Sequence, residues 1–340
     1  MKAAVITGPH KLEFTERPIP VLPDQKSVLM KVRAVGICGS DVHGYHGSLA
    51  TFVYPRVFGH EVVGEIAAVG SEVTHIAVGD HAVMDPVLSC GHCRACRTKR
   101  QNVCVQLRCM GVTAEGGCAE YVVLPAANVH KIPAELPWRE AVLIEPYTIA
   151  AQMTARGEIS ADDYVLIMGA GPIGLVTLQA AKRLGAKVMI TDLSPNRLRL
   201  AAELDADVVV DTRTQNLAQE VERFTDGEGV TVAIDAVGLP ELFEQALELT
   251  GTAARIVIIG FDPRPAKVPE LPITRRELDI RGSRLHADKF PEVIEWFANR
   301  EVKTTPLISH EFDFLDARKA FALIEQSPET TCKVILTFKG

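Results

Sequence analysis

Four cysteines lie close together in the first third of the chain, with a spacing that suits a metal ion. The pattern is C-x2-C-x2-C-x7-C and consists of Cys90, Cys93, Cys96 and Cys104. This spacing lets one lobe, at about residues 88–106, present four thiolates in a tetrahedron around Zn²⁺. Cys109 is an alternative fourth ligand, but the shorter spacing favours Cys104. A site with four protein ligands has no open position for a substrate, so the pattern predicts a structural zinc.

A second set of metal-ligand residues lies at the ends of two candidate strands. Cys38 comes just after one candidate strand, and His60 and Glu61 come directly before another. Thiolate, imidazole and carboxylate are the protein groups that bind Zn²⁺. Each residue alone also suits a core cysteine or a surface histidine. Their combination with the four-cysteine lobe and a nucleotide motif favours a second, open metal site.

The nucleotide motif has the pattern G-x-G-x-x-G, follows an apolar strand and begins a helix. Gly169 permits a tight turn, Gly171 lets the backbone approach a pyrophosphate, and Gly174 allows close packing of helix and strand. Pro172 and Ile173 form the start of the helix, whose free N–H groups bind phosphate. The segment therefore predicts a dinucleotide site.

Asp192 ends the strand that follows this motif. An acid at this place accepts hydrogen bonds from the adenosine ribose and repels a 2′-phosphate, which favours NAD over NADP. Alternatively, Asp192 only caps the next helix, but Ser194 and Pro195 already supply an N-cap and a first-turn proline. Arg197 is the feature that argues for NADP.

The elements that position these residues change character along the chain. Up to about residue 145 we expect an all-β domain of short strands broken by glycine and proline, with strands at 2–7, 27–35, 62–69, 81–84 and 121–124. From residue 164 strands and helices alternate, which predicts a parallel sheet covered on both faces. Its expected strands are 164–168, 187–191, 208–210, 230–235, 254–260 and 279–282, with helices at 173–184, 196–204, 217–224 and 241–249. Two more helices and a strand at 333–338 are expected to return to the first domain.

The composition of the 340 residues is that of a globular protein with two domains, at 47% hydrophobic and 23% charged residues. A net charge of −7 argues against nucleic acid and membrane surfaces as partners. The segment from Tyr164 to Ala181 has no charged residue, but its glycine turn argues against a membrane span. Because Gly8 and Pro9 interrupt the N-terminal apolar segment, we expect no secretory signal and a cytoplasmic protein.

Together these motifs resemble those of the zinc-dependent medium-chain dehydrogenase/reductase family, which includes alcohol, sorbitol and threonine dehydrogenases. The resemblance covers essentially the whole chain and depends on the four-cysteine lobe, the glycine motif, Gly59-His60-Glu61, Gly116-Gly117-Cys118-Ala119-Glu120-Tyr121 and Glu145-Pro146. It implies an α/β fold with three segments. These are a GroES-like β-rich catalytic domain (1–147), a Rossmann NAD-binding domain with a doubly wound parallel sheet (148–286), and a C-terminal return to the catalytic domain (287–340).

The resemblance also implies the cofactors, namely two zinc ions per chain and NAD. It implies that Cys38 and His60 are fixed ligands of a catalytic zinc, and that either Glu61 or Glu145 completes the protein shell. Glu145, in place of a cysteine, is more similar to the polyol dehydrogenases than to the alcohol dehydrogenases. Such enzymes are dimers or tetramers, so the resemblance implies a homo-oligomer.

The expected chemistry is oxidation of an alcohol. Zn²⁺ lowers the pKa of a bound hydroxyl, and the nicotinamide accepts the hydride. The released proton needs a path, and Ser40 with His43, three residues apart at a predicted helix start, suits a relay beside Glu61. His43 is alternatively a solvated loop residue, because His46 lies nearby and the sequence does not rank the two.

Within the family, four segments resemble those of bacterial sugar-acid dehydrogenases of the starvation-sensing type, such as L-gulonate 5-dehydrogenase. They are Tyr54-Pro55-Arg56-Val57, Val87-Leu88-Ser89-Cys90-Gly91-His92-Cys93, Ser283-Arg284-Leu285 and Cys332-Lys333-Val334. That resemblance implies oxidation of a secondary hydroxyl of a sugar acid to a keto-aldonate such as D-fructuronate. A carboxylate substrate needs a cation, and Arg284, just past the last strand of the nucleotide domain, is the first candidate, followed by Arg108. Arg284 alternatively contacts the cofactor or a partner subunit.

Other functions share the same metal and nucleotide residues. The alternative enzymes are a polyol (sorbitol-like), L-galactonate or threonine dehydrogenase. A nucleotide-sensing regulatory protein is the alternative that is not an enzyme. That class is expected to lack metal ligands, whereas Cys38, His60, Glu61 and Glu145 are all present.

Overall fold

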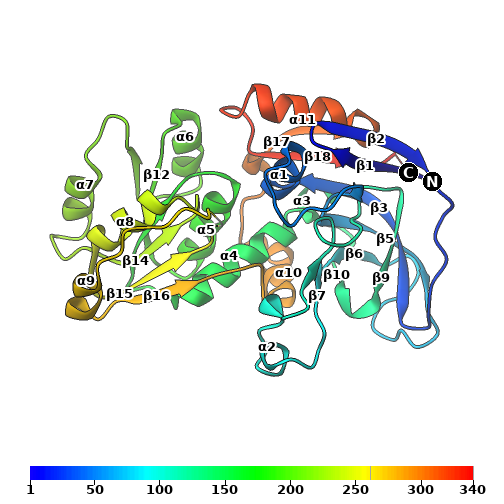
Figure 1. Cartoon of the computed structure of the whole chain (residues 1–340), viewed down its shortest axis with the longest axis horizontal. Helices are drawn as coiled ribbons and strands as arrows, with labels where there is room; N and C mark the ends of the chain where they lie inside the picture. Colours follow the sequence, from blue (N-terminus) through cyan, green and yellow to red (C-terminus); the bar gives the residue numbers. More distant parts are fainter. Residues whose placement is uncertain (261, 340) are drawn as a thin grey trace. The chain divides into compact units, whose positions relative to one another are not determined.

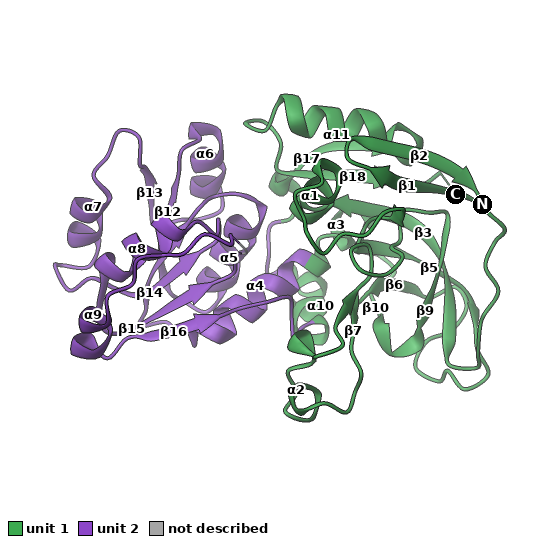
Figure 2. Cartoon of the chain, in the orientation of Figure 1, with its two compact units in different colours: residues 1–145, 290–300, 304–340 green, residues 146–289, 301–303 purple. Residues whose placement is uncertain are grey.

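The computed structural model describes residues 1–260 and 262–339, and it divides the chain into two compact units (Figure 2). Unit 1 consists of Met1–Glu145, Phe290–Arg300 and Thr304–Gly340. Unit 2 consists of Pro146–Lys289 and Glu301–Lys303. The chain therefore leaves unit 1 after Glu145, builds most of unit 2, returns at Phe290, and enters unit 2 again only for Glu301–Lys303.

Unit 1 is built on an antiparallel seven-stranded sheet with β3 (Ser27–Ile37) at its centre. Strand β3 pairs antiparallel with β5 (Glu61–Val69), β9 (Tyr121–Pro125) and β18 (Lys333–Thr337). The sheet continues through β6 (His81–Met84), β10 (Val129–Lys131) and β17 (Ile308–Asp313), and only β17 and β18 pair in parallel. The last strand of the chain thus lies directly beside the strand that leads to Cys38.

Smaller elements complete unit 1 (Figure 1). A three-stranded sheet consists of β1 (Lys2–Gly8), β2 (Lys11–Glu16) and β4 (Arg56–Val57), and a two-stranded sheet of β7 (Val87–Leu88) and β8 (Arg108–Cys109). The sequence did not predict β2, β4, β7, β8, β10 or β17, because these strands are short or carry few apolar residues. The helices are α1 (Gly39–His46), α2 (Arg94–Arg97), α3 (Trp138–Ala141), α10 (Phe290–Ala298) and α11 (Ala317–Gln326).

Unit 2 contains a six-stranded parallel sheet, as the alternation of strands and helices predicted. Its strand order is β13-β12-β11-β14-β15-β16, so the order reverses between β11 and β14, where open sheets of this kind bind ligands at their carboxyl ends. The strands are β11 (Tyr164–Met168), β12 (Lys187–Asp192), β13 (Val208–Asp211), β14 (Val230–Asp235), β15 (Thr250–Ile258) and β16 (Asp279–Gly282). The helices are α4 (Ile144–Gly157), α5 (Pro172–Arg183), α6 (Pro195–Glu203), α7 (Leu217–Phe224), α8 (Pro240–Leu249) and α9 (Glu270–Arg276).

Several bounds differ from the sequence prediction, and helix α9 was not predicted. Strand β15 begins at Thr250 rather than at residue 254, and its register shifts after Thr250, which weakens the apolar pattern there. Helix α4 was not predicted, and it continues through residues 147 and 148, where the sequence suggested a domain boundary. Pro146 lies in the first turn of α4, where a missing N–H costs no hydrogen bond.

The uncharged segment Tyr164 to Ala181 forms β11, the glycine turn and most of α5, as expected. No helix in the described part of the chain is long and apolar enough to cross a membrane.

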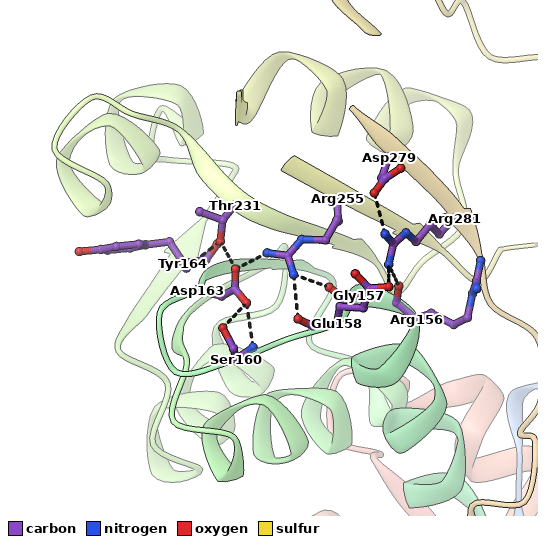
Figure 3. Close-up of polar contacts among 10 residues, drawn as sticks. All are labelled: Arg156, Gly157, Glu158, Ser160, Asp163, Tyr164, Thr231, Arg255, Asp279 and Arg281. Atoms are coloured by element: carbon purple, nitrogen blue, oxygen red, sulfur yellow. Dashed lines mark hydrogen bonds and ion pairs between the residues drawn. The ribbon is translucent and has the colours of Figure 1, made fainter. Parts of the chain in front are cut away.

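A network of polar groups around the buried carboxylate of Asp163 joins α4 to the sheet of unit 2 (Figure 3). Arg255 of β15 donates hydrogen bonds to the carbonyl oxygens of Gly157 (2.9 Å) and Glu158 (2.7 Å) and to Oδ1 of Asp163. Asp163 also accepts hydrogen bonds from Thr231 Oγ1 (2.6 Å) and from the Ser160 N–H (2.8 Å). Arg255 thereby connects the end of α4, the loop before β11 and the middle of the sheet.

These contacts also control the ionisation of Asp163. Burial alone would raise the pKa of its carboxyl, but the bonds from Thr231 and Ser160 and the charge of Arg255 outweigh burial, so the pKa lies below its usual value. The stabilisation is present above the unfolded-state pKa of about 3.9 and is lost as the pH falls through the lower folded-state value.

We predict that Arg255→Met lowers the free energy of unfolding of unit 2 by about 3–5 kcal/mol, because it leaves a buried carboxylate without its cation. The side chain of Asp163 is only 5% exposed. Urea unfolding at neutral pH measures the change. Arg223→Met is the matched control, because Arg223 pairs with Glu220 on the surface of α7, and its removal is expected to cost less than about 1 kcal/mol. Equal effects of the two substitutions would contradict the role of the network.

Candidate functional site

The four predicted cysteines of the lobe come together in the structure. The sulfur atoms of Cys93 and Cys96 are 3.5 Å apart, those of Cys93 and Cys104 are 3.9 Å apart, and those of Cys90 and Cys96 are 4.0 Å apart. A tetrahedral zinc with Zn–S bonds of about 2.3 Å requires sulfur atoms about 3.8 Å apart. The group of sulfur atoms within 4.8 Å of one another contains Cys104 and not Cys109. Cys104 is therefore the fourth ligand of the two candidates. All eight cysteines are free of disulfide bonds.

The ionisation of these thiols also fits a cation. Hydrogen bonds from the backbone N–H groups of Cys96 and Val105 lower the pKa of Cys93 to about 6. Desolvation, together with the neighbouring sulfur atoms of Cys93 and Cys104, raises the pKa of Cys96 to about 11. The thiols thus resist ionising together unless a positive ion lies among them, and Zn²⁺ supplies that charge.

The second metal-ligand group lies where β3 and β5 leave the central sheet of unit 1. One ligand atom each from Cys38, His60 and Glu61 lies within 4.8 Å of the others. Gly36 of β3 pairs with Glu61 of β5, and a Cβ at Gly36 would lie 2.0 Å from Oε2 of Glu61. The glycine therefore leaves room for the carboxylate against the strand that leads to Cys38.

Asp41 holds this group in place. Its Oδ2 accepts a hydrogen bond from the Cys38 N–H (2.9 Å), and its Oδ1 accepts one from the Gly59 N–H (3.2 Å). The side chain is completely buried, and Oδ1 is 3.6 Å from Nδ1 of His60. Burial alone would lower the pKa of His60, but the charges of Asp41 and Cys38 raise it well above its usual value. One carboxylate thus orients the loops that carry both predicted fixed ligands.

His60 gives the clearest sign that this group fits a metal. Its ring is buried, Nδ1 faces the Asp41 carboxylate at 3.6 Å, and Nε2 lies 3.5 Å from Oγ of Ser40. The contact with Asp41 leaves Nε2 as the nitrogen suited to a metal ion. A thiolate, an imidazole and a carboxylate within reach of one another match the ligand preference of Zn²⁺.

Lys333 is a residue of this site that the sequence did not reveal. Its ammonium group lies 2.5 Å and 2.7 Å from the two carboxylate oxygens of Glu61 and 3.5 Å from the carbonyl oxygen of Ile37. The side chains are 4% and 1% exposed. Burial alone would lower the pKa of Lys333, but the charges of Glu61 and Cys38 outweigh it, so the pKa is raised. The only signal in the sequence is a lysine at the first position of an apolar strand.

Glu145, the alternative to Glu61, is also buried, at the start of α4. It does not belong to the group of ligand atoms within 4.8 Å among the described residues. However, burial raises the pKa of Cys109 to about 12, and the charges of Glu145, Asp41 and Cys38 add to the shift. Glu145 therefore lies near enough to act electrostatically on the same surroundings as the metal-ligand group.

The two residues expected to relay a proton lie one turn apart on α1. Ser40 Oγ is 3.5 Å from Nε2 of His60, and His43 Nδ1 is 3.0 Å from Oγ of Ser48. These contacts connect Ser40 inward to the metal-ligand group and connect exposed His43 outward to Ser48. His46, the other histidine of this helix, bonds with Glu325 instead.

The glycine motif of unit 2 adopts the predicted strand–turn–helix form. Gly169 has a φ of +103°, which disfavours other residues, and a Cβ at Gly174 would lie 1.9 Å from the carbonyl oxygen of Gly169. Gly171 is different, because a Cβ there would meet no protein atom within 4 Å. The fold itself does not require this glycine, whereas a closely approaching phosphate does. Helix α5 then begins with Pro172 and Ile173.

Asp192 ends β12, and its carboxylate binds the backbone of the glycine turn and of the segment that follows β12. Its Oδ2 accepts a hydrogen bond from the Ala170 N–H (2.8 Å), and its Oδ1 accepts one from the Ser194 N–H (2.8 Å). Ser194 caps α6, as predicted, by accepting a bond from the Arg197 N–H. Arg197 Nη1 is 3.8 Å from Oδ2 of Asp192. The cation that would favour NADP therefore lies beside the carboxylate that favours NAD.

The two candidates for the substrate cation lie in different units. Arg284 is an exposed residue of unit 2 that follows β16, and Arg108 is an exposed residue of unit 1 at the start of β8. Both assignments stay predictions.

Comparison with known proteins identifies both parts of the chain. Residues 24–134 match the family model of the alcohol dehydrogenase GroES-like domain, and residues 172–299 match that of the zinc-binding dehydrogenases.

Three characterised or named relatives align along most of the chain. The starvation-sensing protein RspB of Escherichia coli is 43% identical, with 99% of both chains covered. The sorbitol dehydrogenase of Bacillus subtilis is 34% identical, with 99% of this chain and 97% of the relative covered. The L-idonate 5-dehydrogenase of Vitis vinifera is 35% identical, with 94% and 90% covered. A crystal structure of rspB from E. coli CFT073, described as a short chain alcohol dehydrogenase complexed with NADH, has a TM-score of 0.95 and 42% identity over 99% of both chains.

We predict that two substitutions separate the two zinc sites. Cys38→Ala should lose one zinc per chain and nearly all turnover while keeping the fold, because the open site is not needed to shape a loop. Cys93→Ser should also lose one zinc but should lower the unfolding temperature, because a structural zinc contributes folding free energy. Metal analysis with thermal unfolding measures both effects. A parent protein with a single zinc, or the same thermal loss in both variants, would contradict the assignment.

Proposed function

Because the chain belongs to the zinc-binding alcohol dehydrogenase family with a GroES-like domain, we propose that it oxidises a secondary hydroxyl of a sugar acid and transfers the hydride to NAD. Membership makes it a zinc-dependent NAD(H) oxidoreductase that acts on CH–OH groups. The observation that carries the proposal is the group of Cys38, His60 and Glu61, whose ligand atoms lie within 4.8 Å of one another, with Cys38 and His60 as the two fixed metal ligands. The product is a keto-aldonate, as in the oxidation of L-gulonate to D-fructuronate.

The metal site of this proposal uses Cys38, His60 and Glu145. Both oxygens of Glu61 already contact Lys333, so Glu61 acts as the partner of Lys333 and leaves the third protein position to Glu145. Zinc in this site supplies a Lewis acid that makes the substrate hydroxyl easier to deprotonate. Asp41 keeps the His60 ring oriented, because a fixed ring presents its nitrogen in one direction.

Proton release uses the exposed face of α1. Ser40 Oγ, beside the His60 ring, accepts the hydrogen bond of the substrate hydroxyl. His43, one turn further along the same helix, is exposed and passes the proton to water. This direction, from a half-buried serine toward an exposed histidine, suits a dehydrogenase because the oxidation releases one proton with each hydride.

NAD is the proposed cofactor, held by Gly169, Gly171 and Gly174 and by Asp192. A carboxylate offers about four lone-pair positions, and Asp192 uses two of them for Ala170 and Ser194. The remaining positions are available to the ribose hydroxyls. The RspB structure that resembles this chain was described with NADH, which supports the same cofactor here.

A sugar acid is the proposed substrate class. The similarity to an L-idonate 5-dehydrogenase supports a carboxylate-bearing substrate with an oxidised secondary hydroxyl. Arg284 is the proposed carboxylate contact, since a guanidinium holds a carboxylate with two parallel hydrogen bonds. The similarity to a sorbitol dehydrogenase supports the second candidate, a neutral polyol.

We predict that the purified, zinc-loaded protein reduces NAD fastest with a sugar acid. The panel is L-gulonate, L-idonate and L-galactonate, with sorbitol and threonine as the alternatives, and the measurement is NADH absorbance. Chelation should abolish the rate, and added zinc should restore it. In Arg284→Met the KM for the sugar acid should rise about tenfold or more, which corresponds to about 1.4 kcal/mol, while the KM for NAD changes little.

Two other results would contradict parts of this proposal. A kcat/KM for sorbitol above that of every sugar acid would replace the proposed substrate with a polyol. A rise in KM for NAD alone in Arg284→Met would refute the carboxylate contact. Lys289→Met, in the same segment, is the matched control for loss of a positive charge.

A further inference from the structure

A third group of metal-ligand residues lies in unit 1, apart from the two zinc sites. It consists of His10, His46 and Glu325, and one ligand atom of each lies within 4.8 Å of the others. His46 Nε2 is 2.6 Å and His10 Nδ1 is 3.5 Å from the same oxygen, Oε1 of Glu325. The two imidazole rings are 5.1 Å apart between their centres and tilted by 32°. A single carboxylate oxygen thus faces two histidine nitrogens.

Three separate elements contribute these residues, and the backbone holds them together. His10 lies in the turn between β1 and β2, His46 is the last residue of α1, and Glu325 lies in the last turn of α11. The N–H of His10 donates to the carbonyl oxygen of Tyr45 (2.7 Å), and the Tyr45 hydroxyl donates to the carbonyl oxygen of His10 (3.3 Å). The Tyr45 ring also packs on Phe321 of α11, with 4.8 Å between ring centres.

This scaffold fixes the positions of the ligand residues before any ion binds. His10 adopts a positive φ of 57°, which points to a turn set by its surroundings rather than by its own preference. Gly47 ends α1 in the left-handed conformation directly after His46. The cost of ordering three side chains is therefore partly met by the fold, which favours binding.

We propose that His10, His46 and Glu325 form a third metal site, which binds Zn²⁺ or a similar divalent transition-metal ion. Two imidazoles and one carboxylate are a ligand set that binds zinc with one position left for water. Bond lengths of about 2.0–2.2 Å require ligand atoms a little more than 3 Å apart. His10 Nδ1 already has this separation from Glu325, and His46 Nε2 needs to move by less than 1 Å from its present hydrogen bond.

An ion bound at this site would contact helix α1, which carries residues of the proposed catalytic site. Helix α1 begins after Cys38, carries Ser40 and Asp41, and ends at His46. An ion bound by His46, Glu325 and His10 connects the end of α1 to α11 and to the β1–β2 turn. Occupancy is therefore expected to stabilise unit 1, because an ion that binds only the folded state shifts the unfolding equilibrium.

The test measures zinc binding to the full-length, zinc-loaded protein by equilibrium dialysis and metal analysis. The parent should bind one zinc equivalent beyond the two of the cysteine sites, and His46→Gln and Glu325→Gln should each lose that equivalent. His75→Gln is the matched control, because His75 is an exposed histidine outside the group. Cys38→Ala should keep the additional equivalent, which separates this site from the proposed catalytic zinc.

A thermal measurement gives a second readout. The unfolding temperature of the parent and of His75→Gln should rise with added zinc, and that of His46→Gln should not. No third equivalent in the parent, a third equivalent that survives in His46→Gln, or one that is lost in His75→Gln would each overturn the proposal. None of these results depends on which substrate the enzyme oxidises.

Discussion

The buried ion pair between Lys333 and Glu61 is the interaction on which the arrangement of the candidate metal site depends. Two charges in a protein interior are stable only when each compensates the other. Here Glu61 comes from β5 and Lys333 from β18, and both strands pair with β3, which leads to Cys38. The returning tail of the chain therefore does more than complete a sheet. It brings the cation that allows a carboxylate to lie beside His60 and Cys38.

Buried carboxylates shape the functional turns of both units in the same way. Asp41 accepts the N–H groups of Cys38 and Gly59, and Asp192 accepts those of Ala170 and Ser194. In each case one side chain connects two backbone segments. Glycines then remove the side chains that would block a ligand. The result is two preorganised surfaces, one suited to a metal ion and one to a dinucleotide, built by similar local means.

The sequence predicted the features that depend on local spacing. The four-cysteine lobe, the glycine turn and the alternating strands of unit 2 each lie within a short segment, so their pattern is visible in the residues. The partner of Glu61 lies 272 residues away along the chain, and only the pairing of β18 with β3 brings it near. The same holds for His10, His46 and Glu325, which come from three distant segments. Helix α4 was not predicted, and Pro146 lies in its first turn, where a proline is tolerated.

A double-mutant cycle on the unfolding free energy of the zinc-loaded protein tests this account most directly. Lys333→Met and Glu61→Gln are each expected to lower the free energy of unfolding by about 3–5 kcal/mol, because each substitution leaves one buried charge without its partner. The double variant should cost less than the sum of the two by at least about 1 kcal/mol, since residues in direct contact are coupled. Metal analysis of the same samples shows whether the variants that break the Lys333–Glu61 pair also lose zinc. Effects that add to within about 0.5 kcal/mol would contradict the central role of this ion pair.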